Sequence, residues 1–544
     1  MTRRGPGAFW LLSLLFAASL YAAVDEEEGR TAGAKGAPEG SSATATGPSS
    51  KPAEPSPTPA APSPTEYSPA PAEPPPRPRA ERAAELLLRG KAEEAAALYA
   101  EALAANPEEA VSLEGRVRAL IAIGRWRQAL EEARRFAAAH PGAGIAQSAL
   151  GEALYRAGAL GEARATLEPL AASPSPPPRA LMTLGLVRVA EGREDEGAKL
   201  MDRALSLAPE DRDVVLSAAG AAPSRARAGE LLERYLMLSP GDDPDRIEGA
   251  RGTLRLYAAL GERRVWVPAS RPRSLELPLR PLIDRGGKTT GFIAELSPGQ
   301  GKPVRVLLDT GSSGLFMLER IALGAGFASL AEETTFGGGG EGRQPSRRGL
   351  IPAVGLGELR FEDALASTTT QEIEPTGRYH GVLGLSVFDG YLVRLDLARG
   401  RLSLESPPET AEGSPYWTVS GQMLVEAATS SGQAGLFLFD TGAARSLLSL
   451  ALLESGSAQA SGEPATVRTY GGPMSGARTV RGVRLRFQGL ENQEAVLNAA
   501  DLAQRSRLGG VEISGFLGLD LLNRARITID TKHRRLSVTK AGRR

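Results

Sequence analysis

The chain has 544 residues, with 64 basic side chains, 64 acidic side chains and no cysteine. The balanced charge gives no argument for nucleic-acid binding, and the missing cysteine excludes disulfides, thiolate metal sites and cysteine nucleophiles. The three histidines, His140, His380 and His533, offer little material for a metal site or for a Ser-His-Asp triad. We therefore expect no metal and no cofactor, and chemistry that needs only carboxylates and water is the easiest to build.

Residues 1–24 have the polarity of an export signal. Arg3 and Arg4 precede an apolar stretch from Phe9 to Val24, and acidic residues follow it. The sequence predicts a cleaved signal peptide or an N-terminal membrane anchor, and in both cases an extracytoplasmic protein that is periplasmic, secreted or membrane-anchored. Arg is preferred over Lys, and Ala and Gly are abundant, which indicates a GC-rich bacterial genome.

Residues 25–79 are rich in Pro, Ala and Ser. Such a segment cannot bury enough apolar surface to offset its ordering entropy, so we predict a disordered, semi-extended linker.

Residues 80–262 show a 34-residue period, which Gly90, Gly124, Gly158 and Gly192 mark. Small residues and prolines recur in the same frame: Ala95, Ala129, Ala163 and Gly197, then Pro107, Pro141 and Pro209. This pattern resembles the tetratricopeptide repeat, in which a glycine lies in the turn between two helices and a proline ends the second helix. We expect an α-solenoid here. It would be a concave surface for a protein partner, or a rigid support for the C-terminal half of the chain.

Beyond residue 262 the pattern changes to short apolar runs separated by Gly-rich turns, which is typical of β-strands. Residues 270–405 and 411–540 align with each other as two copies of one all-β unit. An Asp-Thr-Gly motif follows an apolar strand in each copy, and the two motifs lie 131 residues apart. Gly384 lies 75 residues after the first Asp, and Gly518 lies 78 residues after the second; each ends an apolar-apolar-Gly motif.

The duplicated motifs resemble those of the aspartic peptidase family, in particular its retropepsin-like bacterial members. The resemblance covers about half of the chain and implies a bilobal all-β acid protease fold, with Asp309 and Asp440 as the catalytic pair. It implies that the two threonine hydroxyls cross-link the loops and that the glycines allow close approach. The residues that would support the loops are Thr310, Gly311, Ser312, Thr441, Gly442, Gly384 and Gly518.

The closing hairpin, or flap, is less well defined. Pepsin-type enzymes close the site with a hairpin that carries a tyrosine, and two Gly-rich segments occupy the corresponding positions here. The candidate flap residues are Phe336, Gly337 and Gly338 in the first copy and Tyr470, Gly471 and Gly472 in the second. Serine follows the first Asp-Thr-Gly, as in pepsin-type loops, and alanine follows the second, as in retroviral loops.

Two carboxyls held about 3 Å apart cannot both ionise in a poorly solvated cleft, so one can act as a base while the other acts as an acid. The sequence therefore predicts an aspartic endopeptidase that activates water between Asp309 and Asp440. Its helical arm would recruit a protein substrate or partner. Two alternatives remain: a non-catalytic peptide-binding scaffold, and a peptidase that processes its own linker.

Overall fold

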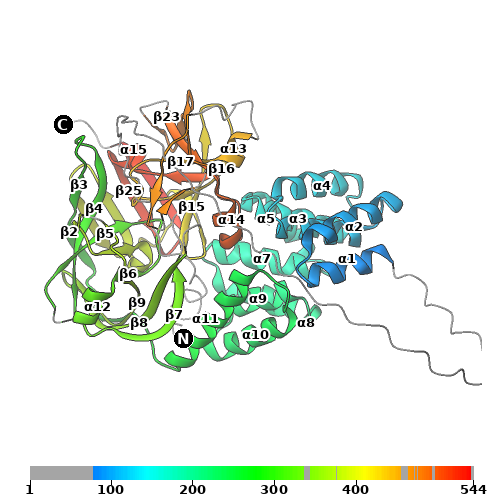
Figure 1. Cartoon of the computed structure of the whole chain (residues 1–544), viewed down its shortest axis with the longest axis horizontal. Coiled ribbons are helices and arrows are strands. Elements are labelled where there is room, and N and C mark those ends of the chain that lie inside the picture. The colour runs from blue at the N-terminus through cyan, green and yellow to red at the C-terminus, as the bar shows by residue number, and fades with distance from the viewer. Residues whose placement is uncertain are drawn as a thin grey trace, which may run out of the picture. The chain divides into compact units, whose positions relative to one another are not determined.

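A computed structural model describes residues 78–299, 301–335, 343–374, 376–454, 463–470, 472–474, 476–492 and 496–540 (Figure 1). The predicted export segment and nearly all of the predicted linker lie outside these residues. Among the helices of the described ranges, none combines the length and the apolar character needed to span a membrane.

Eleven helices form the N-terminal region, in antiparallel pairs (Figure 1). They are α1 (Arg79–Leu88), α2 (Ala92–Ala105), α3 (Ala110–Ala122), α4 (Trp126–Ala139), α5 (Gly144–Arg156), α6 (Leu160–Ala171), α7 (Pro178–Ala190), α8 (Glu194–Leu207), α9 (Arg212–Gly220), α10 (Arg225–Leu238) and α11 (Pro244–Leu260). The prediction of a helical-repeat region is confirmed.

The 34-residue period has a structural cause in the turns. The glycines that mark it have φ between 76° and 81°, the left-handed conformation that other residues seldom adopt. At Gly90, the following Lys91 N–H donates to the carbonyl of Leu86 at 2.9 Å and closes the end of α1. A Cβ at Gly197 would lie 2.6 Å from Cγ2 of Val189, so glycine lets α7 and α8 pack closely.

The C-terminal region has two β-lobes. The sheet of lobe 1 comprises β1 (Val267–Ser270), β3 (Arg280–Ile283), β4 (Thr289–Pro298), β5 (Val304–Asp309), β6 (Leu315–Leu318), β7 (Ala328–Thr335), β8 (Gln344–Leu356), β9 (Leu359–Thr369) and β10 (Gly381–Gly384). The sheet of lobe 2 comprises β14 (Trp417–Val419), β15 (Gln422–Thr429), β16 (Ala434–Phe439), β17 (Leu447–Ser449), β20 (Arg478–Arg481), β21 (Leu485–Phe487), β22 (Leu490–Glu491), β23 (Val496–Ala500) and β24 (Gly515–Leu517). The short elements are α12 (Glu319–Gly324), η1 (Leu385–Phe388), α13 (Leu450–Glu454), α14 (Ala503–Gly509), α15 (Leu519–Leu522), and a hairpin of β18 (Arg468–Thr469) and β19 (Gly472–Pro473).

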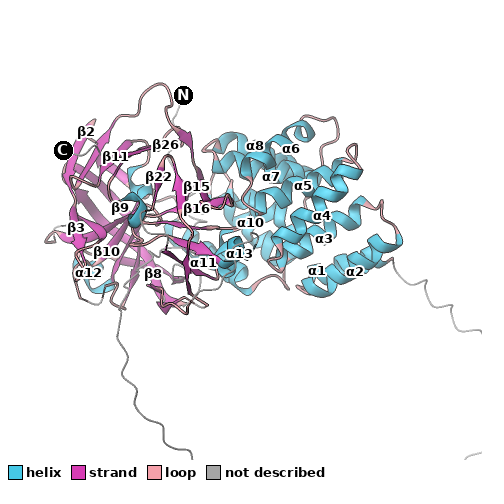
Figure 2. Ribbon diagram, turned by 90° about the horizontal axis from the view of Figure 1, so that it is seen from above, coloured by secondary structure: helices cyan, strands magenta, loops and turns pink. Residues whose placement is uncertain are grey.

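A third sheet joins the lobes and shows their symmetry. Its order is β13 (Ser414–Pro415), β26 (Arg535–Lys540), β25 (Ala525–Asp530), β11 (Leu392–Asp396), β12 (Arg401–Glu405) and β2 (Ser274–Pro278). β11 of lobe 1 pairs antiparallel with β25 of lobe 2, and Arg394 lies opposite Thr528. The two hairpins that meet here are equivalent, because Asp396 pairs with Arg401 in one and Asp530 pairs with Arg535 in the other. The predicted two-lobed all-β architecture is confirmed, and Figure 2 shows its strands in magenta beside the cyan helices.

The helical region packs against both lobes. Tyr155 of α5 belongs to one buried apolar cluster with Leu436 and Leu438 of lobe 2. The turn after α5 also packs closely against lobe 2, since a Cβ at Gly158 would lie 3.1 Å from Cβ of Leu436. The middle of the helical region therefore supports lobe 2 directly.

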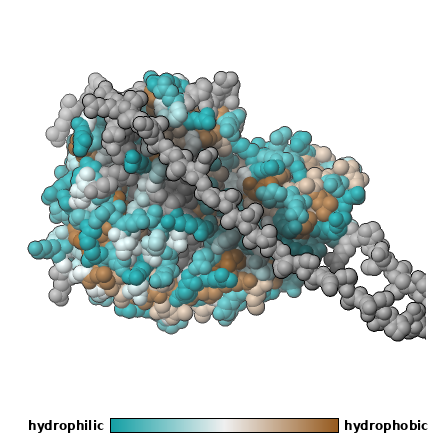
Figure 3. All heavy atoms as spheres, viewed as in Figure 1, coloured by the Kyte–Doolittle hydropathy of each residue, from teal (hydrophilic) through white to brown (hydrophobic). Residues whose placement is uncertain are grey.

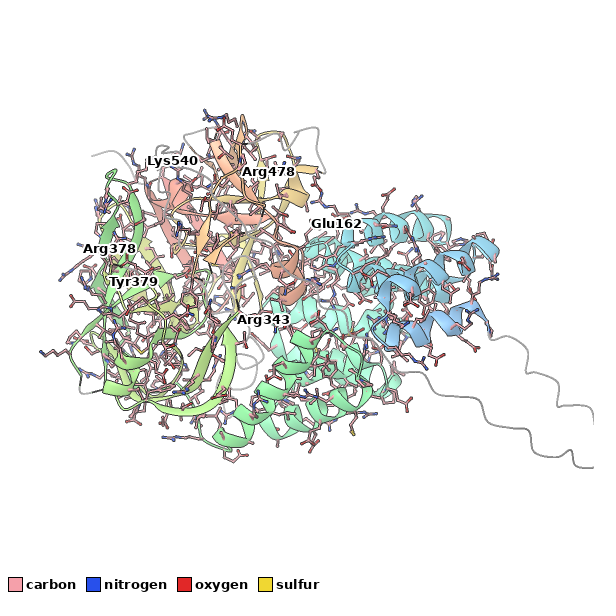
Figure 4. All side chains as sticks on the ribbon, in the orientation of Figure 1. Glu162, Arg343, Arg378, Tyr379, Arg478 and Lys540 are labelled. Atoms are coloured by element: carbon pink, nitrogen blue, oxygen red, sulfur yellow. The ribbon has the colours of Figure 1, made fainter. Side chains whose placement is uncertain are left out.

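Lobe 1 makes its own contact with the helices. Arg343, which directly precedes β8 and is labelled in Figure 4, forms an ion pair with Asp245 of α11. Leu350 and Leu365 of lobe 1 join the apolar core of the later helices. On the face in Figure 3, brown residues lie among teal ones. The large apolar side chains that are exposed in the described part of the chain are Leu88, Val111, Ile145, Leu207, Met237, Ile283 and Leu323.

Candidate active site

Equivalent strands carry the two Asp-Thr-Gly loops. β5 ends at Asp309, and parallel β10 runs beside it with Gly384 opposite that residue. In lobe 2, β16 ends at Phe439 and parallel β24 runs beside it with Leu517 opposite. The last four residues of β5 and of β16 are buried, which fixes the position at which each loop leaves its sheet.

The two loops are cross-linked through their threonines. The N–H of Thr310 donates to Oγ1 of Thr441 at 3.1 Å, and the N–H of Thr441 donates to Oγ1 of Thr310 at 3.0 Å. Each hydroxyl in turn donates to the carbonyl that precedes the opposite Asp: Thr310 to Phe439 at 2.7 Å, and Thr441 to Leu308 at 3.0 Å. Four buried hydrogen bonds therefore hold the lobes in register at the loops.

The glycines of the motif bring each loop against the other carboxyl group. A Cβ at Gly311 would lie 2.7 Å from Cγ of Asp440, and a Cβ at Gly442 would lie 2.5 Å from Cγ of Asp309. Neither distance is compatible with a side chain. The Gly311 N–H donates to Oδ1 of Asp309 at 2.8 Å, and the Gly442 N–H donates to Oδ1 of Asp440 at 2.8 Å.

The supporting glycines contact the loops from beneath. The N–H of Gly384 donates to the carbonyl of Gly314 at 2.7 Å, and a Cβ at Gly384 would lie 2.4 Å from the carbonyl oxygen of Ser312. In lobe 2 a Cβ at Gly518 would lie 2.5 Å from the carbonyl carbon of Arg445. Glycine is thus required at both positions by close backbone approach.

The two carboxyl groups interact with each other inside the protein. Asp309 is 0% exposed and Asp440 is 1% exposed. Burial raises the pKa of Asp440 well above its usual range, and the charge of Asp309 and a hydrogen bond with it raise that pKa further. The N–H groups of Gly442 and Ala443 act in the opposite direction. Such a pair retains one proton over a wide pH range and titrates as a unit.

The structure describes only two of the six candidate flap residues. Phe336, Gly337, Gly338 and Gly471 lie outside the described residues. Tyr470 and Gly472 belong to the β18–β19 hairpin of lobe 2. Contacts can therefore be assigned only to the lobe 2 candidate.

Tyr470 reaches across to lobe 1. Its hydroxyl donates to Oγ1 of Thr369 at 2.6 Å. Its ring meets that of Phe316 edge to face, with centroids 5.1 Å apart. The tyrosine-bearing hairpin of lobe 2 is therefore anchored on the opposite lobe.

Two polar residues that contact the site, Gln422 and Arg505, were not predicted from the sequence. Gln422 opens β15, and its Nε2 donates to the carbonyl of Gly311 at 2.8 Å. Arg505 of α14 is 1% exposed, and its Nη2 donates to Oε1 of Gln422 at 2.7 Å. Neither belongs to a motif, and they reach the catalytic loop only because β15 and α14, which are distant in the sequence, pack together beside it.

The donor set does not suit a metal ion. Within the described part of the chain, no three His, Asp or Glu side chains are grouped so that they could hold one. The paired loops instead present two carboxyl groups with backbone N–H donors, which is a proton-transfer arrangement.

Comparison with known proteins agrees with this geometry. The family model described as "Aspartyl protease" matches residues 296–387 and 425–521, one segment in each lobe. No curated protein matches the chain. Each lobe of the C-terminal region is therefore similar to the aspartyl protease family over the matched segment.

The helical region is similar to tetratricopeptide-repeat structures. A TPR protein from Thermus thermophilus is 21% identical over 32% of this chain and 97% of its own, with a TM-score of 0.26. MamA from Desulfovibrio magneticus is 21% identical over 30% and 92%, with a TM-score of 0.21. PilF from Pseudomonas aeruginosa is 20% identical over 34% and 89%, with a TM-score of 0.24. Because these scores are low, we base the repeat assignment on the 34-residue period and on the helix pairs. The chain combines helical repeats with a two-lobed aspartic protease fold.

Proposed function

We propose that the protein is an aspartic endopeptidase in which Asp309 and Asp440 activate water. The observation that carries this proposal is the pair of buried carboxyl groups, each in contact with the glycine of the opposite loop. This arrangement requires both lobes, and the chain supplies both. A single chain therefore builds a complete site.

In the proposed reaction the ionised carboxyl removes a proton from a water molecule, and the resulting hydroxide attacks the scissile carbonyl carbon. The neutral carboxyl gives its proton to the carbonyl oxygen, and a tetrahedral diol forms. When the C–N bond breaks, the leaving nitrogen takes a proton from the dyad, one diol hydroxyl returns its proton to the dyad, and a carboxylic acid remains. The threonine cross-links hold the carboxyls at a fixed separation, so little reorganisation is needed during the reaction.

An extended peptide is the substrate class that this fold accommodates, since a cleft between two β-lobes can hold a strand. We propose that the β18–β19 hairpin closes over it. Tyr470 is bonded to Thr369 of the other lobe, so substrate entry would require this contact to break. The buried dyad agrees with a closed form.

We also propose that the repeat region recruits a protein. A cavity of about 960 Å³ lies between the helical region and the two lobes. Its lining includes Arg179 and Asp213 of the helices, and Ser420 and Gly421 of the β14–β15 turn. That turn leads directly into Gln422, which contacts the catalytic loop. A protein segment in this cavity would lie close to the site of cleavage.

An extracytoplasmic location is part of the proposal. It rests on the charge and apolar pattern of residues 1–24 and on the Pro-rich segment that follows. A compartment without a reducing thiol pool poses no problem for a chain that lacks cysteine.

The test is peptide release from denatured casein by the purified chain between pH 3 and 8. The Asp309→Asn variant is the inactive counterpart, and Asp202→Asn, at an exposed position of α8, is the matched control. We expect the parent and the control to cut and Asp309→Asn to release nothing measurable. A folded parent that binds peptides without releasing fragments at any of these pH values would overturn the proposal in favour of a binding scaffold.

A further inference from the structure

Arg505 is the largest fully buried side chain of the described residues. Burying a guanidinium is costly unless other groups compensate its charge. The guanidinium carbon of Arg505, Cζ, lies 5.7 Å from the ring centroid of Phe516. Phe516 belongs to β24, the strand that supports the second Asp-Thr-Gly loop. The position of this charge therefore calls for a functional explanation.

A second buried arginine provides a comparison. Arg179 in the helical region is enclosed by Glu152 and Asp211, and these carboxylates raise its pKa despite burial. At Arg505 burial prevails and lowers the pKa to about 10, although the charges of Asp440 and Asp309 act in the opposite direction. The guanidinium is still protonated at neutral pH. The charges of the catalytic carboxyls thus favour the protonated form of Arg505.

A chain of hydrogen bonds connects this charge to the catalytic loop. Arg505 donates to the side-chain oxygen of Gln422, and the amide of Gln422 donates to the carbonyl of Gly311. The N–H of Gly311 donates to Oδ1 of Asp309. We call this hydrogen-bond chain from Arg505 through Gln422 to the Asp309 loop the relay. It begins in lobe 2 and ends in lobe 1, so it adds an asymmetric link to the symmetric threonine cross-links.

We propose that Arg505, acting through Gln422, is a positioning residue that holds the Asp309 loop and supplies the positive charge that balances the singly ionised dyad. The inference rests on the proposed peptidase function and names a determinant of its working pH. Because a nearby positive charge favours ionised carboxyls, Arg505 lowers the pH at which the dyad loses its first proton and also the pH at which it loses its second. Active, singly ionised enzyme thus persists to lower pH.

The other charged groups around α14 have contacts outside the dyad. Arg507 is exposed on the same helix. Asp245 of α11 accepts a hydrogen bond from Gln504, and Arg156 of α5 donates to the carbonyl of Gly510 at 2.8 Å. On the lobe 2 side, Arg445 and Asp520 act on each other. The effect on the dyad is therefore assigned to Arg505 itself.

The experiment follows the dyad in the full chain by two independent readouts. The ¹³Cγ shifts of labelled aspartates give its macroscopic pKa values, and kcat and KM for a peptide that the parent cleaves give its activity. The variants are Arg505→Met, Arg505→Lys and Gln422→Met, with Arg507→Met as the control on the same helix. The NMR readout separates the two proposals, since it requires no cleavage.

We expect Arg505→Met to raise both macroscopic pKa values by about one unit, and Arg505→Lys to keep them near those of the parent. Gln422→Met keeps the charge, so its pKa values change little, while kcat falls about tenfold with KM nearly unchanged. Arg507→Met behaves as the parent. The lysine and Gln422 variants retain the buried charge, so they remain informative if Arg505→Met does not fold.

Two results would overturn the inference. One is a folded Arg505→Met variant whose dyad titrates as in the parent. The other is an unchanged kcat in both Gln422→Met and Arg505→Lys, since the relay would then position nothing. A parent that shows coupled dyad titration but no cleavage at all contradicts the peptidase proposal and leaves the pKa comparison decisive for Arg505.

Discussion

The two lobes hold their catalytic carboxyls with the same inner contacts and with different outer ones. In both lobes a threonine hydroxyl crosses to the other loop, and a glycine lies against the other carboxyl. These contacts reach across the pseudo-two-fold axis, so a change in one lobe would have to be matched in the other. These inner contacts are therefore alike in the two lobes.

Outside this centre the lobes diverge. In lobe 1, Ser386 Oγ accepts the N–H of Gly314 at 2.8 Å. In lobe 2 the equivalent position, two residues after the supporting glycine, is Asp520, which accepts both the N–H and the hydroxyl of Ser446, at 2.8 and 2.6 Å. Lobe 2 alone supplies the relay through Gln422. The geometry at the dyad is therefore shared by both lobes, whereas the buried positive charge of Arg505, which interacts with the dyad, comes from lobe 2 alone among the described residues.

The largest effect should come from filling the space at the shared centre. Gly442→Ala and Gly311→Ala each place a methyl group within 2.7 Å of the opposite carboxyl carbon. We expect each to lose at least about a hundredfold in kcat, and about 1–3 kcal/mol in the free energy of unfolding. The control is Gly161→Ala, where a Cβ meets nothing within 4 Å. A fully active Gly442→Ala enzyme would show that the loops do not approach as described.

The threonine cross-links test the symmetry itself. Thr310→Val and Thr441→Val each remove one donated and one accepted hydrogen bond, so we expect equal losses of about 2 kcal/mol in the free energy of unfolding. Thr→Ser at either position keeps the hydroxyl and is the matched control. Urea titration of the four variants measures this. Clearly unequal losses would mean that the two threonines contribute unequally to the free energy of unfolding.

The equivalent positions Asp520 of lobe 2 and Ser386 of lobe 1 should differ in how their contribution to the free energy of unfolding depends on pH. Burial raises the pKa of Asp520, although its bonds from Ser446 act in the opposite direction. The folded state therefore favours protonated Asp520 more than the unfolded state does, and this contribution to stability is lost as the pH rises from the ordinary Asp range, near 4, through the raised pKa. Relative to Asp520→Asn, the parent should gain stability as the pH falls from 7 toward 4.

Ser386→Ala, the lobe 1 counterpart, removes no carboxyl. Its difference from the parent in the free energy of unfolding should be the same at both pH values. If the Asp520→Asn difference is also independent of pH, the described burial of Asp520 does not govern its ionisation.

The smallest effect is expected at the hairpin that joins the lobes from outside the dyad. Tyr470→Phe removes one hydrogen bond to Thr369 and keeps the ring against Phe316. We expect a change of a few fold in KM or kcat, because a single hydrogen bond contributes about 1 kcal/mol. Thr369→Val should have the same effect, and the double variant should add nothing to it. Additive effects would show that the two side chains act separately.

The sequence predicted what depends on local or repeated patterns. The helical repeats follow from glycines that need a positive φ at a fixed spacing, and the two-lobed fold follows from a duplicated motif. Gln422 and Arg505 could not be predicted, because they meet the loop only after distant segments pack together. Nor does a repeat motif reveal that Tyr155 and Gly158 pack on lobe 2 rather than face a partner.

The most direct test of the central claim is the kcat of Asp309→Asn, Asp440→Asn and the double variant on one cleavable peptide. If the two carboxyls act as one unit, each single variant loses about a thousandfold or more, and the double variant is no worse than either single one. The account is contradicted if one single variant keeps substantial activity, or if the double variant loses the product of the two single effects.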